Sequence, residues 1–313
     1  MNPIAKSSVL MTGATGFLGS HLAKRLLAEG YRVGILKRAR SDTWRLAKEL
    51  PQLVAFDLER ADLSDLFDRF RPGMILHCAT DYGRKKVDFT QLVDVNLHLP
   101  LRLLQEADRV GTPLFINTDT FLDKRVSPYS LSKRQFDEWL RLYADRMGCV
   151  SMALEHFYGP GDDPSKFVSS IIANLFDEVD EIHLTPGLQS RDFIFIDDVI
   201  NAFMHVIRAA PGFGKVYRRF EVGSGSKHTI RETVEQAKTI SKNARTALKF
   251  GSLPYRENEV METRMNLEPL LALGWKANWT LEAGLKKTWE GECQMREERK
   301  TALSQKIQTE QTL

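Results

Sequence analysis

Short apolar runs alternate with longer amphipathic stretches over the first half of the chain. The runs are almost continuously apolar, as strands buried on both faces of a sheet must be; they cover residues 9–11, 33–36, 53–56, 74–77 and 114–116. Segments with a helical period separate most of them, near residues 17–28, 45–50, 65–70, 89–107 and 128–147. Strand and helix in alternation predict right-handed crossovers and a parallel sheet.

The pattern loosens after a further apolar run at 150–154, and residues 158–164 are dense in turn formers. We therefore predict an α/β fold: a doubly wound parallel sheet of the Rossmann type with a smaller C-terminal substrate lobe. The predicted Rossmann domain covers 1–155 with 190–224 returning to it, and the predicted lobe covers 156–189 and 225–290. Thr280 could cap a last helix over 281–289. The polar segment 291–313 has no strong periodicity, so we expect a fraying helix or disorder there.

Composition excludes several classes of protein. Of 313 residues, 42% are hydrophobic and 27% charged, as in ordinary globular proteins. The formal charge of +3 is too small to indicate a nucleic-acid partner. Three cysteines, far apart and without metal-ligand spacing, indicate a reducing compartment and no metal site. No apolar run approaches the ~18 residues of a membrane span, so we expect a cytoplasmic protein with no membrane partner.

The segment 12–19 connects the first predicted strand to the first predicted helix. Its sequence, Thr-Gly-Ala-Thr-Gly-Phe-Leu-Gly, has the spacing G-x-x-G-x-x-G. Glycines there let the backbone turn tightly and let a pyrophosphate approach the helix N-terminus. A lone glycine triplet could be only a turn, but the strand-turn-helix context predicts dinucleotide binding. The residues expected to contact the cofactor here are Gly13, Thr15, Gly16, Phe17, Leu18 and Gly19.

The end of the second predicted strand selects the dinucleotide. An NAD-preferring site usually has an acid there for the ribose 2′-hydroxyl, whereas this chain has Lys37 and Arg38. Cations attract a 2′-phosphate, so we expect NADP(H) rather than NAD(H). The alternative is a solvated basic loop. Asp57 follows the third strand, where it could meet the adenine or cap the next helix.

Tyr129 and Lys133 are spaced i and i+4, so a helix places both on one face. Ser127 and Pro128 supply an N-cap and a first-turn proline. An ammonium beside a phenol favours the phenolate, so we expect Lys133 to lower the pKa of Tyr129 toward the range of a general acid or base. The preceding strand delivers residues 117–120 to the same crevice.

Three further segments complete a set of motifs. Asp57-Leu58, His77-Cys78-Ala79 and Asn96 accompany the glycine turn and the Tyr129/Lys133 pair. Over residues 7–290 this set resembles the extended short-chain dehydrogenase/reductase family of nucleotide-sugar epimerases, dehydratases and reductases. The resemblance implies that Asp57 and Leu58 contact the adenine side of the cofactor. It also implies that Cys78 and Ala79 lie beneath the nicotinamide and that Asn96 is the helix asparagine that contacts the cofactor.

The same resemblance implies a catalytic triad of Thr118, Tyr129 and Lys133. The threonine would hydrogen-bond the substrate oxygen, the tyrosine would exchange its proton, and the lysine would hold the nicotinamide ribose and tune the tyrosine. For Thr118 the alternative is a strand-end hydroxyl that satisfies the backbone.

Substrate contacts follow from the resemblance as well. Arg191 resembles the arginine that grips a sugar-nucleotide diphosphate, and Arg256 resembles a second one. Each could instead be a surface ion-pair partner, although two forked guanidiniums suit a pyrophosphate. His156 stands where the family usually has an asparagine, and it could contact substrate or be a satisfied loop histidine. The expected partner is a nucleotide-diphosphate sugar.

The two residues that follow Thr118 distinguish the reaction classes of this family. Family dehydratases carry an Asp-Glu pair, whereas here Asp119 precedes Thr120; we therefore do not expect dehydration and assign both residues to substrate binding. The segments 117–120, 127–133 and 155–162 look closest to the CDP-abequose and CDP-paratose synthase group. The resemblance implies NADPH-dependent reduction of the 4-keto group of a nucleotide-linked deoxyhexose, of the CDP-4-keto-3,6-dideoxyhexose type, in the biosynthesis of surface-polysaccharide or glycoconjugate sugars.

Two other functions stay open at this point, a nucleotide-sugar 4-epimerase and a non-catalytic NADP-binding sensor or scaffold. The presence of both Tyr129 and Lys133 argues against the second. The family also suggests a homodimer whose seam is formed by 89–107 and 128–147. Its apolar stripe could come from Leu97, Leu101 and Leu104 or from Leu140 and Tyr143, although such stripes are also typical of core packing.

Overall fold

The chain forms two compact units. A computed structural model describes residues 8–83, 88–257 and 259–311. Unit 1 comprises Met1–Glu155, Ile200–Val222 and Asn266–Lys276, and unit 2 comprises His156–Val199, Gly223–Met265 and Ala277–Leu313. The sequence-based division has the chain return to the first domain at residue 190. In the structure the return begins at Ile200, and the short segment Asn266–Lys276 joins unit 1 as well.

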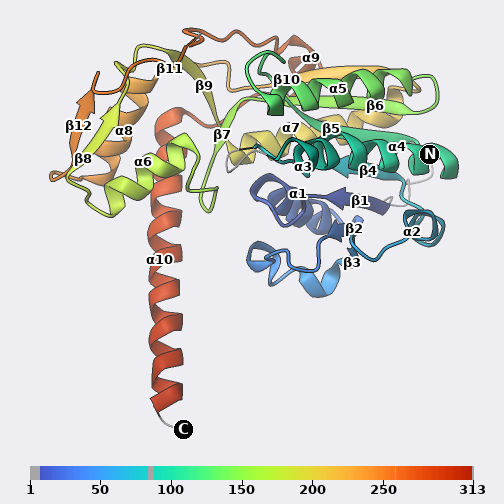
Figure 1. Cartoon of the computed structure of the whole chain (residues 1–313), viewed down its shortest axis with the longest axis horizontal. Coiled ribbons are helices and arrows are strands. Elements are labelled where there is room, and N and C mark those ends of the chain that lie inside the picture. The colour runs from blue at the N-terminus through green and yellow to red at the C-terminus, as the bar shows by residue number, and fades with distance from the viewer. Residues whose placement is uncertain (1–7, 84–87, 258, 312–313) are drawn as a thin grey trace. The chain divides into compact units, whose positions relative to one another are not determined.

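Unit 1 is built on a seven-stranded sheet whose strand pairs are all parallel. The order β10-β6-β5-β4-β1-β2-β3 runs outward from β1 in both directions, which is the predicted doubly wound arrangement (Figure 1). The order reverses between β1 and β4, and open α/β sheets bind ligands at the carboxyl ends of such strands. The strands are β1 (Ser8–Thr12), β2 (Arg32–Lys37), β3 (Val54–Asp57), β4 (Met74–His77), β5 (Leu114–Thr120), β6 (Gly148–Leu154) and β10 (Tyr217–Val222).

Helices connect these strands. α2, α4 and α5 contribute buried side chains to one common core cluster. α1 and α7 lie outside that cluster and are joined by an ion pair between Glu29 and Arg208, 2.6 Å long. The helices are α1 (Phe17–Ala28), α2 (Leu63–Phe70), α3 (Phe89–Val93), α4 (Leu99–Val110), α5 (Pro128–Leu142), α7 (Ile196–Ala209) and α9 (Glu268–Leu271).

Three predicted helices differ from the observed ones. The segment near 45–50 forms only two 3-10 turns, Trp44–Leu46 and Leu50–Gln52, since Pro51 lacks the N–H that a longer helix needs. The segment 89–107 is interrupted by a π-helical turn at Asp94–His98, shortly before Pro100. The helix predicted for 128–147 ends at Leu142.

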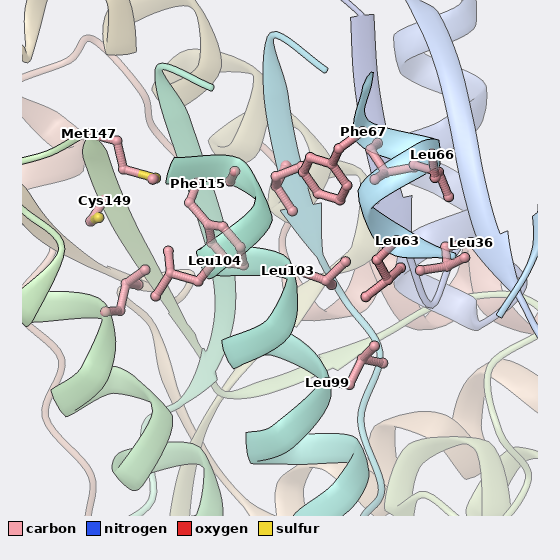
Figure 2. Packing of buried hydrophobic residues seen from close by; sticks show 14 of the residues in the cluster. Leu36, Leu63, Leu66, Phe67, Leu99, Leu103, Leu104, Phe115, Met147 and Cys149 are labelled. Carbon is pink, nitrogen blue, oxygen red and sulfur yellow. The ribbon is translucent and has the colours of Figure 1, made fainter. Parts of the chain in front are cut away.

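The core cluster of unit 1 lies between the sheet and helices α2, α4 and α5 (Figure 2). Phe67 of α2, Leu103 of α4 and Phe115 of β5 are fully buried in it. Leu104 and Leu140, which the sequence offered to a dimer seam, are fully buried in the same cluster. The other three residues of that predicted stripe are partly buried and pack against the cluster, namely Leu97, Leu101 and Tyr143. The predicted stripe is therefore core.

Unit 2 contains a three-stranded sheet in the order β11-β9-β7 and a separate parallel pair, β8 and β12. Helix α10 begins after Thr280, whose hydroxyl accepts the N–H of Ala283 at 3.2 Å, as predicted. The helix continues to Gln311, so the polar segment is helical that far; residues 312–313 lie outside the described residues. The elements are β7 (His156–Tyr158), β8 (Glu181–Leu184), β9 (Ser190–Phe195), β11 (Lys227–Thr229), β12 (Ala247–Phe250), α6 (Phe167–Phe176), α8 (Ile230–Ser241) and α10 (Leu281–Gln311).

Among the described residues, no helix has both the length and the apolar character needed to cross a membrane. Within the same residues, histidine, cysteine and carboxylate side chains form no group of three that could hold a metal ion. Cys78, Cys149 and Cys293 are free thiols.

Replacing Phe67 by alanine should lower the free energy of unfolding by about 3–5 kcal/mol, because the change opens a cavity in a close-packed core. Phe89 is the matched control, since its ring is 61% exposed, and Phe89→Ala should change stability by no more than about 0.5 kcal/mol. Urea denaturation followed by circular dichroism measures both variants. Equal losses would contradict the assignment of this cluster as the main core of unit 1.

Candidate active site

Two glycines at the turn between β1 and α1, Gly13 and Gly19, leave no room for a side chain. Gly13 has φ of +68°, and a Cβ there would lie 2.5 Å from the backbone nitrogen of Ala79. A Cβ on Gly19 would lie 2.1 Å from the carbonyl oxygen of Gly13. The turn therefore needs glycine both for its backbone conformation and for its close approach to the end of β4.

The start of α1 suits an anion. Gly16, its N-cap residue, supplies no capping side chain, so the positive end of the helix dipole is left for a group such as pyrophosphate. Thr15 is half-buried beside it, whereas Phe17 and Leu18 point their bulk into the protein and are 7% and 8% exposed. These two can therefore meet a ligand chiefly through their backbone. The turn fits the dinucleotide that the sequence predicts.

The residues expected around the adenosine lie together at the ends of β2 and β3. Lys37 and Asp57 are register partners, and the N–H of Leu58 donates to the Lys37 carbonyl at 2.8 Å. The Lys37 ammonium donates to the carbonyl of Arg38 at 3.3 Å, and the Arg38 side chain is exposed. The Asp57 carboxylate accepts the N–H of Glu59 at 3.0 Å. Two cations and one carboxylate thus flank the same strand ends.

Asn96 holds the loop after β4 against α5. Its amide donates to the Asp81 carbonyl at 2.8 Å and to the Ser132 hydroxyl at 3.0 Å. Its amide oxygen accepts the N–H of Asp81 at 2.8 Å. Asn96 is fully buried, so its observed bonds fix the loop that begins at Cys78. The π-helical turn that interrupts 89–107 is the segment that carries this side chain.

Tyr129 lies in the first turn of α5. Ser127 caps this helix, since its hydroxyl accepts the N–H of Ser130 at 3.1 Å. The ring of Tyr129 packs against that of Tyr82, with centroids 5.0 Å apart. Thr80 and Thr120 hydrogen-bond its hydroxyl. Strand end, loop and helix thus converge on one phenol.

The pKa of Tyr129 is raised above its ordinary value. Burial is the largest cause, Tyr82 and Asp119 add to it, and the hydrogen bonds from the two threonines oppose it only in part. The expectation that Lys133 lowers this pKa is wrong: the cost of burying a phenolate dominates, and Lys133 is not among the groups that shift the pKa of Tyr129. The phenol is therefore held in its protonated form.

Lys133 is buried one helical turn from Tyr129. Its side chain is 1% exposed, and among the described residues its ammonium finds no hydrogen-bond partner. Burial lowers its pKa, while the charges of Asp119, Cys78 and Asp137 oppose that shift. An unsatisfied buried ammonium is costly, and the hydroxyls of a nicotinamide ribose would satisfy it. This orphaned donor is the second feature of the chain that fits a dinucleotide.

The threonines at the end of β5 have different partners. Thr118 donates to the carbonyl of His77 at 3.1 Å, which is the backbone role weighed as its alternative. The Thr120 hydroxyl accepts the N–H of Leu122 at 3.2 Å and also bonds Tyr129. Sequence reasoning missed this contact of Thr120 with the phenol. Its signal was the alternation of side chains along a strand, which puts residues 118 and 120 on one face.

Asp119 has a partner that sequence reasoning also missed. Its carboxylate forms an ion pair with Arg219 of β10 and accepts a hydrogen bond from Ser151 of β6 at 3.5 Å. Its side chain is 3% exposed. The aspartate expected to bind substrate is therefore engaged inside unit 1.

Three expected substrate contacts belong to unit 2. His156 of β7 packs edge-on against the ring of Phe193, 5.6 Å away. Arg191 of β9 pairs with the carboxylate of Glu259 and donates to the carbonyl of Val260 at 2.7 Å. Arg256 is exposed in the segment before Glu259. The structure thus places Arg191 and Arg256 at one loop of unit 2, and it assembles the expected cofactor and catalytic groups within unit 1.

The chain is similar to known proteins over most of its length. The model of the NAD-dependent epimerase/dehydratase family matches residues 9–223. CDP-abequose synthase of Salmonella muenchen is 33% identical over 288 residues, covering 89% of this chain and 96% of that protein. UDP-glucose 4-epimerase of Mycolicibacterium smegmatis is 29% identical over 314 residues, covering 90% and 97%.

Solved structures share the fold. UDP-glucose 4-epimerase of Thermotoga maritima, solved with UDP-glucose, superposes with a TM-score of 0.80 at 21% identity, covering 92% of this chain and 99% of that one. The Thermus thermophilus enzyme, solved with NAD, gives a TM-score of 0.73 at 24% identity, covering 91% and 98%. With the glycine turn, the pairing of Tyr129 with the buried Lys133 and the matching family model, this chain belongs to the NAD-dependent epimerase/dehydratase family of nucleotide-sugar enzymes.

Proposed function

We propose that the protein reduces the 4-keto group of a nucleotide-linked deoxyhexose with NADPH. The observation that carries this proposal is a half-buried phenol one helical turn from a buried ammonium that finds no hydrogen-bond partner among the described residues. A ketone reduction needs a proton donor at the carbonyl oxygen, and a phenol is protonated at neutral pH and can fill that role. The similarity to CDP-abequose synthase supports a substrate of the CDP-4-keto-3,6-dideoxyhexose type.

The chain's own residues would divide the work as follows. When bound, the reduced nicotinamide supplies the hydride that adds to the sugar C4 carbon. Tyr129 gives its hydroxyl proton to the oxygen of that carbonyl as negative charge develops there. Thr118 offers a second hydroxyl at the same strand end, once it exchanges its bond to the His77 carbonyl for one to substrate. Lys133 holds the cofactor ribose through its unsatisfied ammonium.

A 4-epimerase is the second candidate, and it is favoured by the epimerases among the relatives. An epimerase returns the hydride to the other face of the sugar and leaves its cofactor unchanged after each turnover. A reductase instead consumes one NADPH per product. The absence of the Asp-Glu pair leaves both candidates standing, whereas it removes the base that dehydration requires.

Lys37 and Arg38 support NADP(H) as the cofactor, since both lie at the end of β2 beside the expected adenosine ribose. Arg191 and Arg256 are proposed to bind the substrate diphosphate, and His156 the sugar or its phosphates. Binding at Arg191 requires the diphosphate to replace or join Glu259. The free cysteines suit a reducing compartment, and we place the reaction in the cytoplasm.

Tyr129→Phe should lower kcat by roughly 100-fold or more, because general-acid catalysis contributes that much. The binding of NADPH, followed by its fluorescence, should be nearly unchanged. The oxidation of NADPH in the presence of a panel of 4-keto nucleotide sugars measures turnover. Tyr143→Phe, at the C-cap of α5, is the control. Near-normal turnover by Tyr129→Phe would overturn the mechanism.

Replacing Lys37 and Arg38 together by alanine should weaken NADPH binding by roughly 10- to 100-fold, the value of one charge-assisted hydrogen bond. NADH binding should change little, because NADH lacks the 2′-phosphate. Fluorescence titration of both cofactors provides the measurement, with the exposed Lys48→Ala as control. The assignment fails if the unaltered protein prefers NAD(H).

A homodimer is proposed through the outer face of α5. Leu131, Trp139 and Leu142 are 44%, 46% and 66% exposed there, and burying them offers apolar area for self-association. Light scattering at micromolar concentration should give twice the chain mass of 35.7 kDa. Trp139→Glu should give the monomer, whereas Leu271→Glu on α9 should not. A monomer before substitution would contradict this proposal.

A further inference from the structure

Arg219 ties the edge of the sheet to the catalytic strand. It lies on β10, the edge strand, in register with Ser151 of β6. Its guanidinium pairs with the carboxylate of Asp119 and also donates to the carbonyl of Thr120 at 3.2 Å. The side chain therefore crosses β6 and makes both of its bonds with the last two residues of β5.

Both bonds of Arg219 are made with the C-terminal end of β5, which lies beside the proposed active site. Thr120, whose carbonyl Arg219 holds, bonds the Tyr129 hydroxyl through its own side chain. Thr118 lies two residues earlier on the same face of the strand. Because a forked guanidinium fixes both a carboxylate and a carbonyl, it restrains the direction of the strand end more tightly than a single bond would.

The Asp119–Arg219 pair also belongs to the charge environment of the catalytic groups. Asp119 acts electrostatically on both Tyr129 and Lys133. A buried carboxylate is costly without a partner, and Arg219 supplies that partner to Asp119. The other titratable groups facing this cluster come from the β4 loop, α5 and β10, namely Cys78, Tyr82, Asp137 and Tyr217.

We propose that Arg219 is a positioning residue for proton transfer by Tyr129, acting through Asp119 and the Thr120 carbonyl. The proposal rests on the proposed reduction. It also changes the role expected for Asp119 from substrate binding to a structural one, because its carboxylate is engaged by Arg219 and Ser151. Two features then argue against dehydratase chemistry. Thr120 stands where the Asp-Glu pair has its glutamate, and Arg219 engages the carboxylate of Asp119.

Three variants separate the effects of charge and geometry. Asp119→Asn leaves Arg219 as an uncompensated cation, which lowers the pKa of Tyr129. The alkaline limb of the pH profile of kcat should therefore move to lower pH. Arg219→Met leaves the carboxylate uncompensated, so that limb should move to higher pH, and kcat should fall roughly 100-fold through misplacement of the strand end. The double variant should return the limb toward its original place while kcat stays low, because the bond to the Thr120 carbonyl is still missing.

KM for the sugar and the affinity for NADPH should hardly change in Arg219→Met. A raised KM with unchanged kcat would overturn the proposal, because it would make Arg219 a direct substrate contact. Arg218→Met is the matched control on the same strand, since Arg218 packs over the Phe213 ring instead. An equal loss of kcat in that control would also overturn the proposal.

A second measurement does not depend on substrate. Protein labelled with 13C at tyrosine Cζ gives an NMR titration of each phenol, and the Tyr129 resonance is the one absent from Tyr129→Phe. It should titrate at lower pH in Asp119→Asn than in the unaltered protein, and an unmoved titration overturns the proposal. If no 4-keto sugar is turned over, the proposed function fails while this titration still decides the role of the pair. Arg219→Lys, which keeps the charge and loses the fork, serves if Arg219→Met does not fold; it should keep the titration of Tyr129 and lose kcat.

Discussion

The placement of a half-buried phenol one helical turn from a fully buried ammonium is the constraint on which the rest of the proposed site depends. Each group resists ionisation there, since burial raises the pKa of Tyr129 and lowers that of Lys133. The charge of Asp119 opposes the effect of burial on Lys133, and hydrogen bonds from two threonines oppose its effect on the phenol. The unsatisfied ammonium then becomes a binding determinant, since a ligand with hydroxyl groups recovers the hydrogen bonds that folding removed.

The scaffold explains how such a pair is held. Parallel strands deliver their carboxyl ends to one edge, so the loop after β4 and the end of β5 reach the first turns of α5. Asn96 then locks the loop to α5 through Asp81 and Ser132. The glycine turn approaches the same loop so closely that no Cβ fits between them. The glycine turn, the loop after β4 and α5 are thus mutually restrained, which would preorganise them for the proposed hydride and proton transfer.

Patterns with a short range in sequence were predictable, and α1 was predicted at its observed bounds because a glycine turn precedes it and Gly30 ends it. The segment 45–50 was misread because its apolar spacing suits a helix, whereas Pro51 limits it to 3-10 turns. Leu104 and Leu140 could not be assigned to core or seam from periodicity, since both environments select the same residues. The spacing of Tyr129 and Lys133 indicated that they share a helix face but carried no information on burial, which reversed the expected direction of the Tyr129 pKa.

The partners of Asp119 show why a motif alone does not specify chemistry. Asp119 and Arg219 are a hundred positions apart in sequence, and only the strand order β10-β6-β5 brings them together. The sequence around Asp119 suggests a potential acid. The residues that surround it in space show that it is one half of an ion pair. The surroundings of Asp119 are therefore set as much by a residue on the far side of β6 as by its neighbours along β5.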